Sequence, residues 1–304
     1  MSFIPLFILN TVIWGTTWLA IKYQIEVVSP IWSVVYRFGL ASLLLLVFCL
    51  LTRRNLGYSR VAHSIMALQG LFLFCLNYIL YYIGTSYLIS GLVALIGACT
   101  IFFNIINSYL FFKMPIMIRV VVGASIGFLG LAIVFSNEIG KMYQETAGLR
   151  GIIIGIMCCV LGALIASFGN MTAVKLHRMQ IPLLQGAAIS MIYGTLYSTV
   201  IALLFQQPLQ FSFSPSYLIS LFYLTIFGTI IAFGCYLTLL NNVGPARAGY
   251  ISIITPLVAI LISTFFESFS WSYVTVIGMI LIIGGNVLVL TKRNPSVKAS
   301  FQPK

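Results

Sequence analysis

Tyrosine and asparagine side chains that could bind a polar solute interrupt several otherwise apolar stretches of this chain. Tyr78, Tyr81 and Tyr82 are spaced i, i+3 and i+4, so on a helix they lie on one face, and Asn77 is adjacent. Asn104 stands in the following stretch. Such a stripe can hydrogen-bond a polar solute while its rings contact an apolar portion. The alternative is that these groups bond only to neighbouring helices.

Arg37 lies inside an apolar stretch, residues 30–52, where a guanidinium is costly unless it is paired or hydrated. It could hold a carboxylate of a bound molecule, or it could anchor backbone carbonyl groups. Trp14, Thr17 and Tyr236 complete the set of candidate binding residues. Lys22 could also contact a bound molecule, but its long side chain could instead reach the membrane surface.

Carboxylates are scarce. The chain has no aspartate, and its four glutamates all fall at or near predicted ends of apolar stretches: Glu26, Glu138, Glu145 and Glu267. A proton or sodium relay built on a buried carboxylate therefore lacks its usual part. The position of Glu267 favours a structural bond, although tyrosine or His177 could still take part in proton transfer.

Catalytic and metal-binding groupings are scarce as well. The six cysteines lie inside apolar stretches, where we interpret them as packing residues. The only histidines are His63 and His177, and their spacing is not that of a metal site. The sequence contains no Walker-type phosphate loop, so ATP hydrolysis by this chain is not expected. We therefore predict no catalytic residues, no metal and no cofactor, and we do not expect an enzyme.

The elements that must position these residues are membrane-spanning helices. Of the 304 residues, 61% are hydrophobic and 7% are charged, whereas a soluble domain carries about 25% charged residues. A helix needs about 20 mainly apolar residues to cross a bilayer. Ten such runs are present: 3–21, 30–52, 62–82, 88–112, 115–136, 149–172, 182–205, 216–240, 246–266 and 272–291. The sequence predicts an all-α integral membrane protein with ten transmembrane helices.

The basic residues predict the orientation of these helices. If the N-terminus lies in the cytoplasm, 12 of the 16 lysines and arginines fall on the cytoplasmic side and three on the other, with Arg37 inside a span. We therefore expect both termini in the cytoplasm and the chain in the cell (inner) membrane. The net charge of +12 is scattered over short loops, so no nucleic-acid partner is expected. The oligomeric state stays open.

Paired glycines indicate that the two halves of the chain are related. Gly123 and Gly130 in VVGASIGFLGLAIV match Gly278 and Gly285 in VIGMILIIGGNVLV at an offset of 155 residues. We interpret these four glycines as structural residues that allow close helix packing. Chance similarity between apolar helices is the alternative.

An offset near half the chain length suggests a duplicated five-helix unit, and Tyr81 matches Tyr236 at the same offset. Five is odd, so the second copy enters the membrane from the opposite side, and a binding site is expected near the midplane between the two inverted repeats. We predict repeats at residues 1–147 and 148–291, followed by a basic cytoplasmic tail at 292–304.

The whole chain resembles the drug/metabolite transporter superfamily, particularly its EamA-type ten-helix members. IWGTTWLAIK is similar to the family's Trp-Gly-small-polar opening, and SPIWSVVYRFGLASLL places Arg37 where the family has an arginine. The most specific match is in the second half, where Pro256 and Glu267 are eleven residues apart and Gly278 and Gly285 follow.

The first half departs from the family pattern. Phe102 stands where a mid-helix proline is usual, and Lys113 stands where a glutamate usually closes the helix. Pro256 removes one backbone hydrogen bond and allows a kink, so we expect Pro256 and Glu267 to have gating or structural roles. The counterpart stretch 88–112 lacks this proline and is expected to be the stiffer of the two.

The resemblance implies a secondary transporter that works without ATP, by alternating access, and exports amino acids or related small polar metabolites. The alternative solute is a nucleoside-like metabolite such as S-adenosylmethionine, taken up or exchanged. Because a buried carboxylate relay is lacking, we expect downhill export or solute exchange. The expected partners are a small-molecule substrate and the lipid bilayer. A non-transporting membrane scaffold is the alternative of a different class, and it would produce no solute flux.

Overall fold

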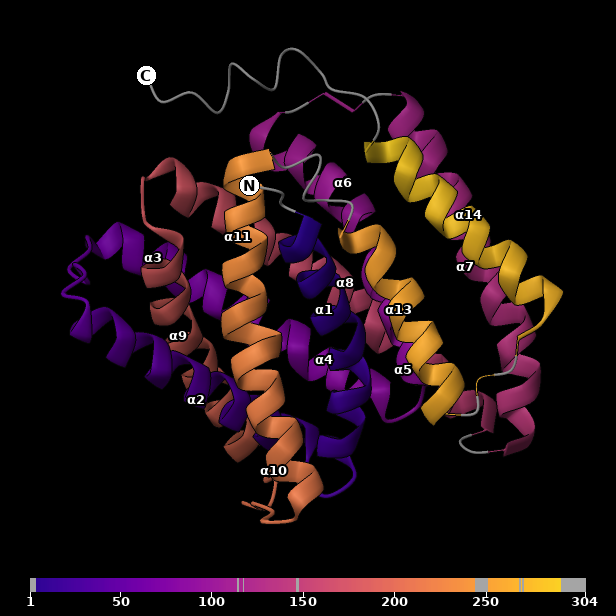
Figure 1. The fold of residues 1–304 in the computed structure, drawn as a ribbon, viewed down its shortest axis with the longest axis horizontal. Helices are drawn as coiled ribbons and strands as arrows, with labels where there is room; N and C mark the ends of the chain where they lie inside the picture. Colours follow the sequence, from indigo (N-terminus) through magenta and orange to yellow (C-terminus); the bar gives the residue numbers. More distant parts are fainter. Residues whose placement is uncertain are drawn as a thin grey trace.

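The computed structural model describes residues 4–113, 115–116, 118–145, 148–243, 251–267, 269 and 271–290. All regular elements in these ranges are helices (Figure 1). They are α1 Ile4–Ile25, α2 Pro30–Leu51, α3 Arg60–Gln69, η1 Gly70–Leu76, α4 Asn77–Thr85, α5 Ser90–Ala98, α6 Thr100–Phe112, α7 Ile118–Glu145, α8 Gly148–Arg178, α9 Leu183–Leu204, α10 Pro215–Phe222, η2 Tyr223–Ile231, α11 Ala232–Val243, α13 Ile251–Phe266 and α14 Tyr273–Leu290. The predicted tail at 292–304 lies outside the described residues.

The expected all-α integral membrane fold is confirmed. Seven continuous helical stretches of the described residues are long and apolar enough to cross a membrane, and shorter apolar helices cover Val121–Val134, Ile254–Phe266 and Tyr273–Leu288. These elements fall on the ten predicted spans one by one, although a count of ten crossings stays a prediction. Large apolar side chains such as Leu51 and Phe265 are 79% and 80% exposed, as expected for side chains that face lipid.

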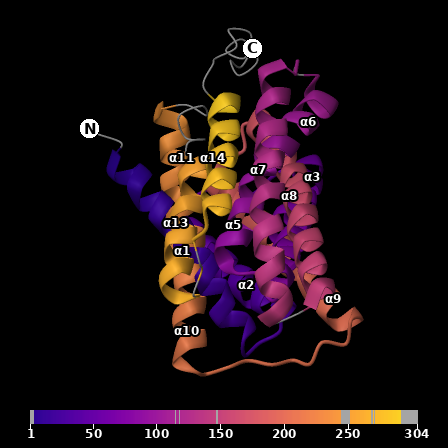
Figure 2. The same ribbon diagram turned by 90° about the vertical axis from the view of Figure 1, so that its right-hand side faces the viewer.

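The helices form a bundle in which the two halves of the chain are interleaved. The C-terminal helix α14 runs beside α7 along one edge, and α2, α9 and α3 form the opposite edge (Figures 1 and 2). Between these edges, α1 packs against α13, and α13 packs against α5. The start of α1 and the end of α14 lie toward the same end of the bundle in both views. An even number of crossings requires this arrangement.

Glycines allow α7 and α14 to approach closely. A Cβ atom at Gly130 would lie 2.5 Å from the Gly278 carbonyl oxygen, and one at Gly278 would lie 2.7 Å from the Gly130 oxygen. Gly285 meets Gly123 and Gly127 in the same way. The four predicted glycines therefore face one another in two pairs, as small-residue packing in membranes requires.

Two π-helices occur at corresponding places in the two halves. They are η1, Gly70–Leu76, and η2, Tyr223–Ile231, and the α-helices that follow them begin at Asn77 and Ala232, 155 residues apart. In η2 the hydroxyl of Thr229 donates to the carbonyl of Leu224, five residues earlier, at 2.8 Å. Asn10 on α1 donates to the Ala232 carbonyl at 2.5 Å. Side chains thus satisfy backbone groups of the π-helical region, a geometry frequent at functional sites.

A one-residue interruption of the α-helical pattern lies in the half where the proline is missing. In the first half Cys99 separates α5 from α6, and the amides of Cys99 and Phe102 each bond three residues back, at 3.0 Å. In the second half α13 continues from Ile251 to Phe266 with Pro256 inside it. The sequence did not predict the interruption at Cys99, and the expectation that the stretch 88–112 is the stiffer of the two stays a prediction. The Phe102 side chain, 1% exposed, packs where Gly127 leaves room for its ring.

Candidate functional site

Arg37 is the centre of a polar site in the middle of the bundle. Its side chain is 2% exposed, although it stands on an apolar helix, α2. The Nε atom donates to the hydroxyl of Thr229 at 3.3 Å, and Nη1 donates to the hydroxyl of Tyr82 at 3.4 Å. Three helical elements, α2, α4 and η2, therefore meet at one guanidinium.

Each hydroxyl that accepts from Arg37 donates its own hydrogen elsewhere. Thr229 donates to the Leu224 carbonyl, and Tyr82 donates to the side-chain oxygen of Gln24 on α1 at 2.7 Å. Both oxygens are thus oriented with lone pairs toward the guanidinium. The tyrosine hydroxyl also joins α1 to α4 across the site.

Aromatic rings cover the guanidinium. The Arg37 carbon Cζ lies 4.8 Å from the ring centre of Tyr78 and 5.2 Å from that of Phe38. These contacts are within the range of cation–π attraction. Gly228, on η2, leaves room beside the group, because a Cβ there would lie 2.8 Å from the Thr17 methyl and 3.6 Å from Arg37 Nη2. Thr17 therefore lies next to Arg37.

The site carries a positive charge that no described carboxylate neutralises. Among the described side chains, the carboxylate of Glu267 forms an ion pair with Lys22, and the carboxylate of Glu26 is exposed. Arg37 instead contacts neutral hydroxyls and rings. A buried guanidinium held this way can still donate bidentate hydrogen bonds to a carboxylate.

The predicted tyrosine stripe divides between two clusters. Tyr78 and Tyr82 contact Arg37, whereas Tyr81 packs edge-on against Trp18 with ring centres 5.2 Å apart. Asn77 is buried, and its amide nitrogen reaches only the Leu73 carbonyl, at 3.4 Å, while its side-chain oxygen has no partner among the described residues.

The other predicted binding residues lie in two further places. Trp14 packs against Tyr236, with ring centres 5.4 Å apart, and against Phe233. Phe233 in turn contacts Phe74, which contacts Phe38 beside Arg37, so a chain of rings links this pair to the arginine. Asn104 lies apart from these rings, between α6 and α8, where it accepts a hydrogen bond from Asn170 at 3.1 Å.

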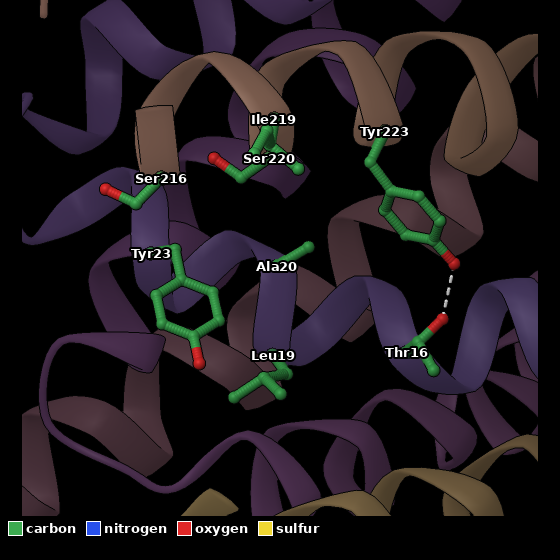
Figure 3. A pocket seen from close by; sticks show the side chains of 8 residues that line it. All are labelled: Thr16, Leu19, Ala20, Tyr23, Ser216, Ile219, Ser220 and Tyr223. Carbon is green, nitrogen blue, oxygen red and sulfur yellow. Dashed lines mark hydrogen bonds between the residues drawn. The ribbon is translucent and has the colours of Figure 1, made fainter. Parts of the chain in front are cut away.

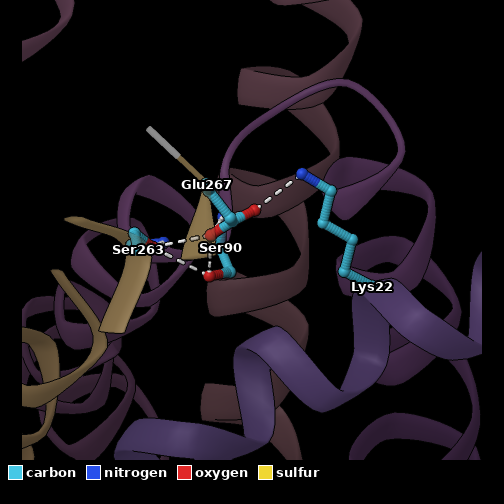
Figure 4. A network of polar contacts seen from close by, with 5 residues as sticks. Lys22, Ser90, Ser263 and Glu267 are labelled. Atoms are coloured by element: carbon cyan, nitrogen blue, oxygen red, sulfur yellow. Dashed lines mark hydrogen bonds and ion pairs between the residues drawn. The ribbon is translucent and has the colours of Figure 1, made fainter. Parts of the chain in front are cut away.

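Glu267 is the common acceptor of a hydrogen-bond network at the end of α13 (Figure 4). Its carboxylate accepts from Lys22 at 2.8 Å, from the Ser263 hydroxyl at 2.7 Å, and from both the amide, at 3.0 Å, and the hydroxyl of Ser90. Ser90 is the first residue of α5, where a helix favours a negative charge. Burial raises the pKa of the carboxyl, but the bonds from Lys22, Ser90 and Ser263 outweigh it and hold this pKa below its ordinary value.

A separate hollow of about 320 Å³ lies between α1 and α10 (Figure 3). Thr16 and Tyr223 meet at one end of it, with their hydroxyl oxygens 2.5 Å apart. The predicted binding residues do not line this hollow; its walls are Thr16, Leu19, Ala20, Tyr23, Ser216, Ile219, Ser220 and Tyr223. At the Arg37 site, Arg37, Tyr82 and Thr229 are buried and Tyr78 is half-buried.

Sequence reasoning missed Gln24 and Thr229. Gln24 is a polar residue that follows Lys22 near the end of α1, and Thr229 repeats Thr225 at i, i+4 inside an apolar run. Polar residues inside apolar spans are the signal that could have found them. Their pairing with Arg37 depends on distant helices and is visible only in the fold.

The fold is that of a polytopic membrane protein with a buried polar site between helices from both halves of the chain, the class to which solute carriers belong. The model of the EamA-like transporter family matches residues 1–136 and 153–291. The chain therefore belongs to the EamA-like transporter family, and the resemblance to the drug/metabolite transporters is confirmed.

Known proteins are similar over most of the chain. Protein PagO of Salmonella typhimurium is 24% identical over 289 residues, which cover 95% of this chain and 93% of PagO. The uncharacterized inner membrane transporter YedA of Escherichia coli is 29% identical over 257 residues, covering 83% of this chain and 79% of YedA. A solved crystal structure superposes with a TM-score of 0.66 at 17% identity, over 94% of this chain and 95% of that one, and supports the fold alone.

Proposed function

We propose that this family member is a secondary carrier in the cell (inner) membrane that exports amino acids or related small carboxylates by alternating access. One observation carries the proposal: Arg37 is buried, and none of the described side chains supplies a carboxylate to it. An arginine that served only structure would be expected to have a carboxylate or carbonyl partner. A substrate carboxylate completes the site instead.

The residues around Arg37 have distinct proposed roles. Arg37 binds the carboxylate, Tyr82 and Thr229 orient the guanidinium, and Tyr78 covers it. Trp14 and Tyr236, with Thr17, contact the apolar part of the solute as it passes. Further binding positions, from the sequence prediction, are Asn77, Tyr81 and Asn104.

The proposed architecture is two inverted five-helix repeats, 1–147 and 148–291, with both termini in the cytoplasm. The corresponding π-helices and the paired glycines support a duplication. The family model also matches the chain in two consecutive ranges. In such carriers the two repeats rock around a fixed central site.

The energy source proposed is the solute gradient itself or exchange of one solute for another. Glu267, directly after α13, is engaged by Lys22, Ser90 and Ser263 and is therefore not free to carry a proton through the site. An uncompensated Arg37 also repels a net-positive solute, so the nucleoside-like sulfonium compound gains no support from the site. No catalytic role is proposed for any residue.

Flux in proteoliposomes tests the function. The purified protein is reconstituted into proteoliposomes, which are loaded with labelled amino acids and nucleosides. The variant Arg37→Gln is compared with Lys113→Gln, which removes an exposed charge at the end of α6. We expect amino-acid flux that is lost in Arg37→Gln and kept in Lys113→Gln. Absence of flux for every solute would favour a scaffold. Equal flux in the two variants would show that Arg37 does not bind the solute.

A further inference from the structure

Three fully buried polar side chains beside the Arg37 site have atoms without a hydrogen-bond partner in the described part of the chain. They are the amide nitrogen of Gln24 and the hydroxyls of Ser33 and Tyr217. All three side chains have an exposure of 0%. Buried polar atoms are nearly always paired, so three together require an explanation.

The three side chains converge on one place next to Arg37. Gln24 on α1 is bonded to Tyr82, which is bonded to Arg37. Ser33 stands one helical turn before Arg37 on the same face of α2. Tyr217 on α10 is a neighbour of both Ser33 and Tyr82, and its ring packs in the same buried cluster as Tyr82.

No neighbouring element of the described fold supplies the missing bonds. Tyr36 and Trp32, the nearby polar rings on α2, donate to the carbonyls of Gln210 and Gln207 instead. The hydroxyls of Ser33 and Tyr217 are close to each other but do not meet hydrogen-bond geometry. A partner from outside the chain, either solute or water, would satisfy all three groups at once.

The chemistry of the three groups defines what they can hold. The amide nitrogen donates, and the two hydroxyls can donate or accept. A cationic group on the solute's side chain would be repelled by the nearby Arg37 charge. A carboxylate on that side chain would have no cation of its own, since the described side chains here supply none besides Arg37. An uncharged hydroxyl or amide suits the groups best.

We propose that Gln24, Ser33 and Tyr217 form a second subsite that binds an uncharged hydroxyl or amide group on the side chain of a carboxylate solute held by Arg37. This inference rests on the proposed function, since it takes Arg37 as the carboxylate site. The substrate class it names is the hydroxylated or amidated amino acids and their relatives, in preference to purely apolar ones. A site built to bond a hydroxyl rejects the analogue that lacks it, because its own groups are then left unpaired.

Matched solutes and matched variants test the subsite. L-serine against L-alanine and L-tyrosine against L-phenylalanine differ by one hydroxyl each. Tyr217→Phe and Ser33→Ala each remove one hydroxyl from the protein. Ser42→Ala is the control, since Ser42 is a buried serine of α2 whose hydroxyl is already bonded to the Gly39 carbonyl at 2.9 Å. Flux in proteoliposomes and ligand-induced shifts of Tm in detergent are measured for every combination.

We expect the wild type to move the hydroxylated member of at least one pair about tenfold faster, the effect of one hydrogen bond. Tyr217→Phe and Ser33→Ala should abolish this preference by slowing the hydroxylated solute alone, and Ser42→Ala should keep it. Equal effects of the variants on both members of a pair would mean that water fills the subsite and would overturn the inference while leaving the carrier function intact. If no carboxylate solute is moved or bound, the proposed function fails together with it.

Discussion

The Nζ atom of Lys22 lies 2.8 Å from the Oε1 atom of Glu267, and this ion pair ties the end of α1 to the end of α13. Through Ser90 the same carboxylate also caps the start of α5. The sequence position that corresponds to Glu267 in the first half is Lys113, so the chain has this carboxylate at one end of the bundle without its counterpart. We propose that the Lys22–Glu267 network is a latch that must open in each transport cycle.

Removing the latch carboxylate should loosen that end of the bundle. Glu267→Ala leaves Lys22 and the Ser90 amide without their acceptor. Because Lys22 is 35% exposed while the carboxylate is buried, we expect a cost below the roughly 3 kcal/mol of breaking a fully buried pair. We expect a lower Tm in detergent and faster labelling of a cysteine placed at Ser86, which lines a small hollow beside Lys22. Lys113→Gln, at an exposed lysine after the end of α6, is the control and should change neither. Unchanged labelling in Glu267→Ala would argue against a latch.

The latch should resist mild acid. Since the pKa of Glu267 is lowered in the folded protein, its stabilisation is fully present above the ordinary carboxyl pKa of about 4.3 and is lost as the pH falls through the lower folded value. Thermal unfolding between pH 8 and pH 3 should therefore show no loss of this group's stabilisation until the pH is below about 4.3. In Glu267→Gln this part of the acid loss should be missing. A loss of the contribution already at pH 6 would contradict the lowered pKa.

Arg37 can be separated into binding and structural roles by one substitution. Arg37→Met keeps most of the side-chain volume but removes the charge, and replacement of buried charges by apolar groups is often neutral or stabilising. Thr229 and Tyr82 keep their bonds to Leu224 and Gln24. We expect Tm to be maintained while carboxylate flux falls at least about a hundredfold, the effect of losing a bidentate contact of roughly 3 kcal/mol. A large drop in Tm would favour the anchoring role instead.

Adjacent glycines of α14 give a matched pair of variants. A Cβ at Gly285 would lie 2.8 Å from the Gly127 amide nitrogen, whereas a Cβ at Gly284 meets nothing within 4 Å. Gly285→Ala should lower the free energy of unfolding by about 1–3 kcal/mol through overpacking against α7. Gly284→Ala should be neutral or stabilising by up to about 1 kcal/mol, as expected for alanine in a helix. Equal Tm values for the two variants would mean that the close α7–α14 contact is absent.

Pro256 lies inside a helix that remains continuous, so its predicted role is in movement rather than in the resting shape. Pro256→Ala restores one backbone donor and should slow flux several-fold while leaving Tm the same or higher. Accessibility of cysteines introduced along α13 provides the second measurement. If flux and accessibility both match the wild type, Pro256 has no gating role.

Much of this protein could be predicted from its sequence because lipid imposes a simple rule. A span must be helical and about 20 apolar residues long, so the composition alone located the helices and made Arg37 conspicuous. The paired glycines at an offset of 155 likewise predicted where two helices approach closely, and the fold brings those glycines together.

Tertiary structure alone decided which side chains meet. A helix that is apolar all round carries no periodic signal of which face it buries, and a π-helix shifts the register of every residue after it. Tyr78 and Tyr82 therefore contact Arg37, while Tyr81 packs against Trp18. The further members of the site, Gln24 and Thr229, lie on other helices. The interruption at Cys99 occurs without a proline, and Phe102, beyond it, packs against Gly127.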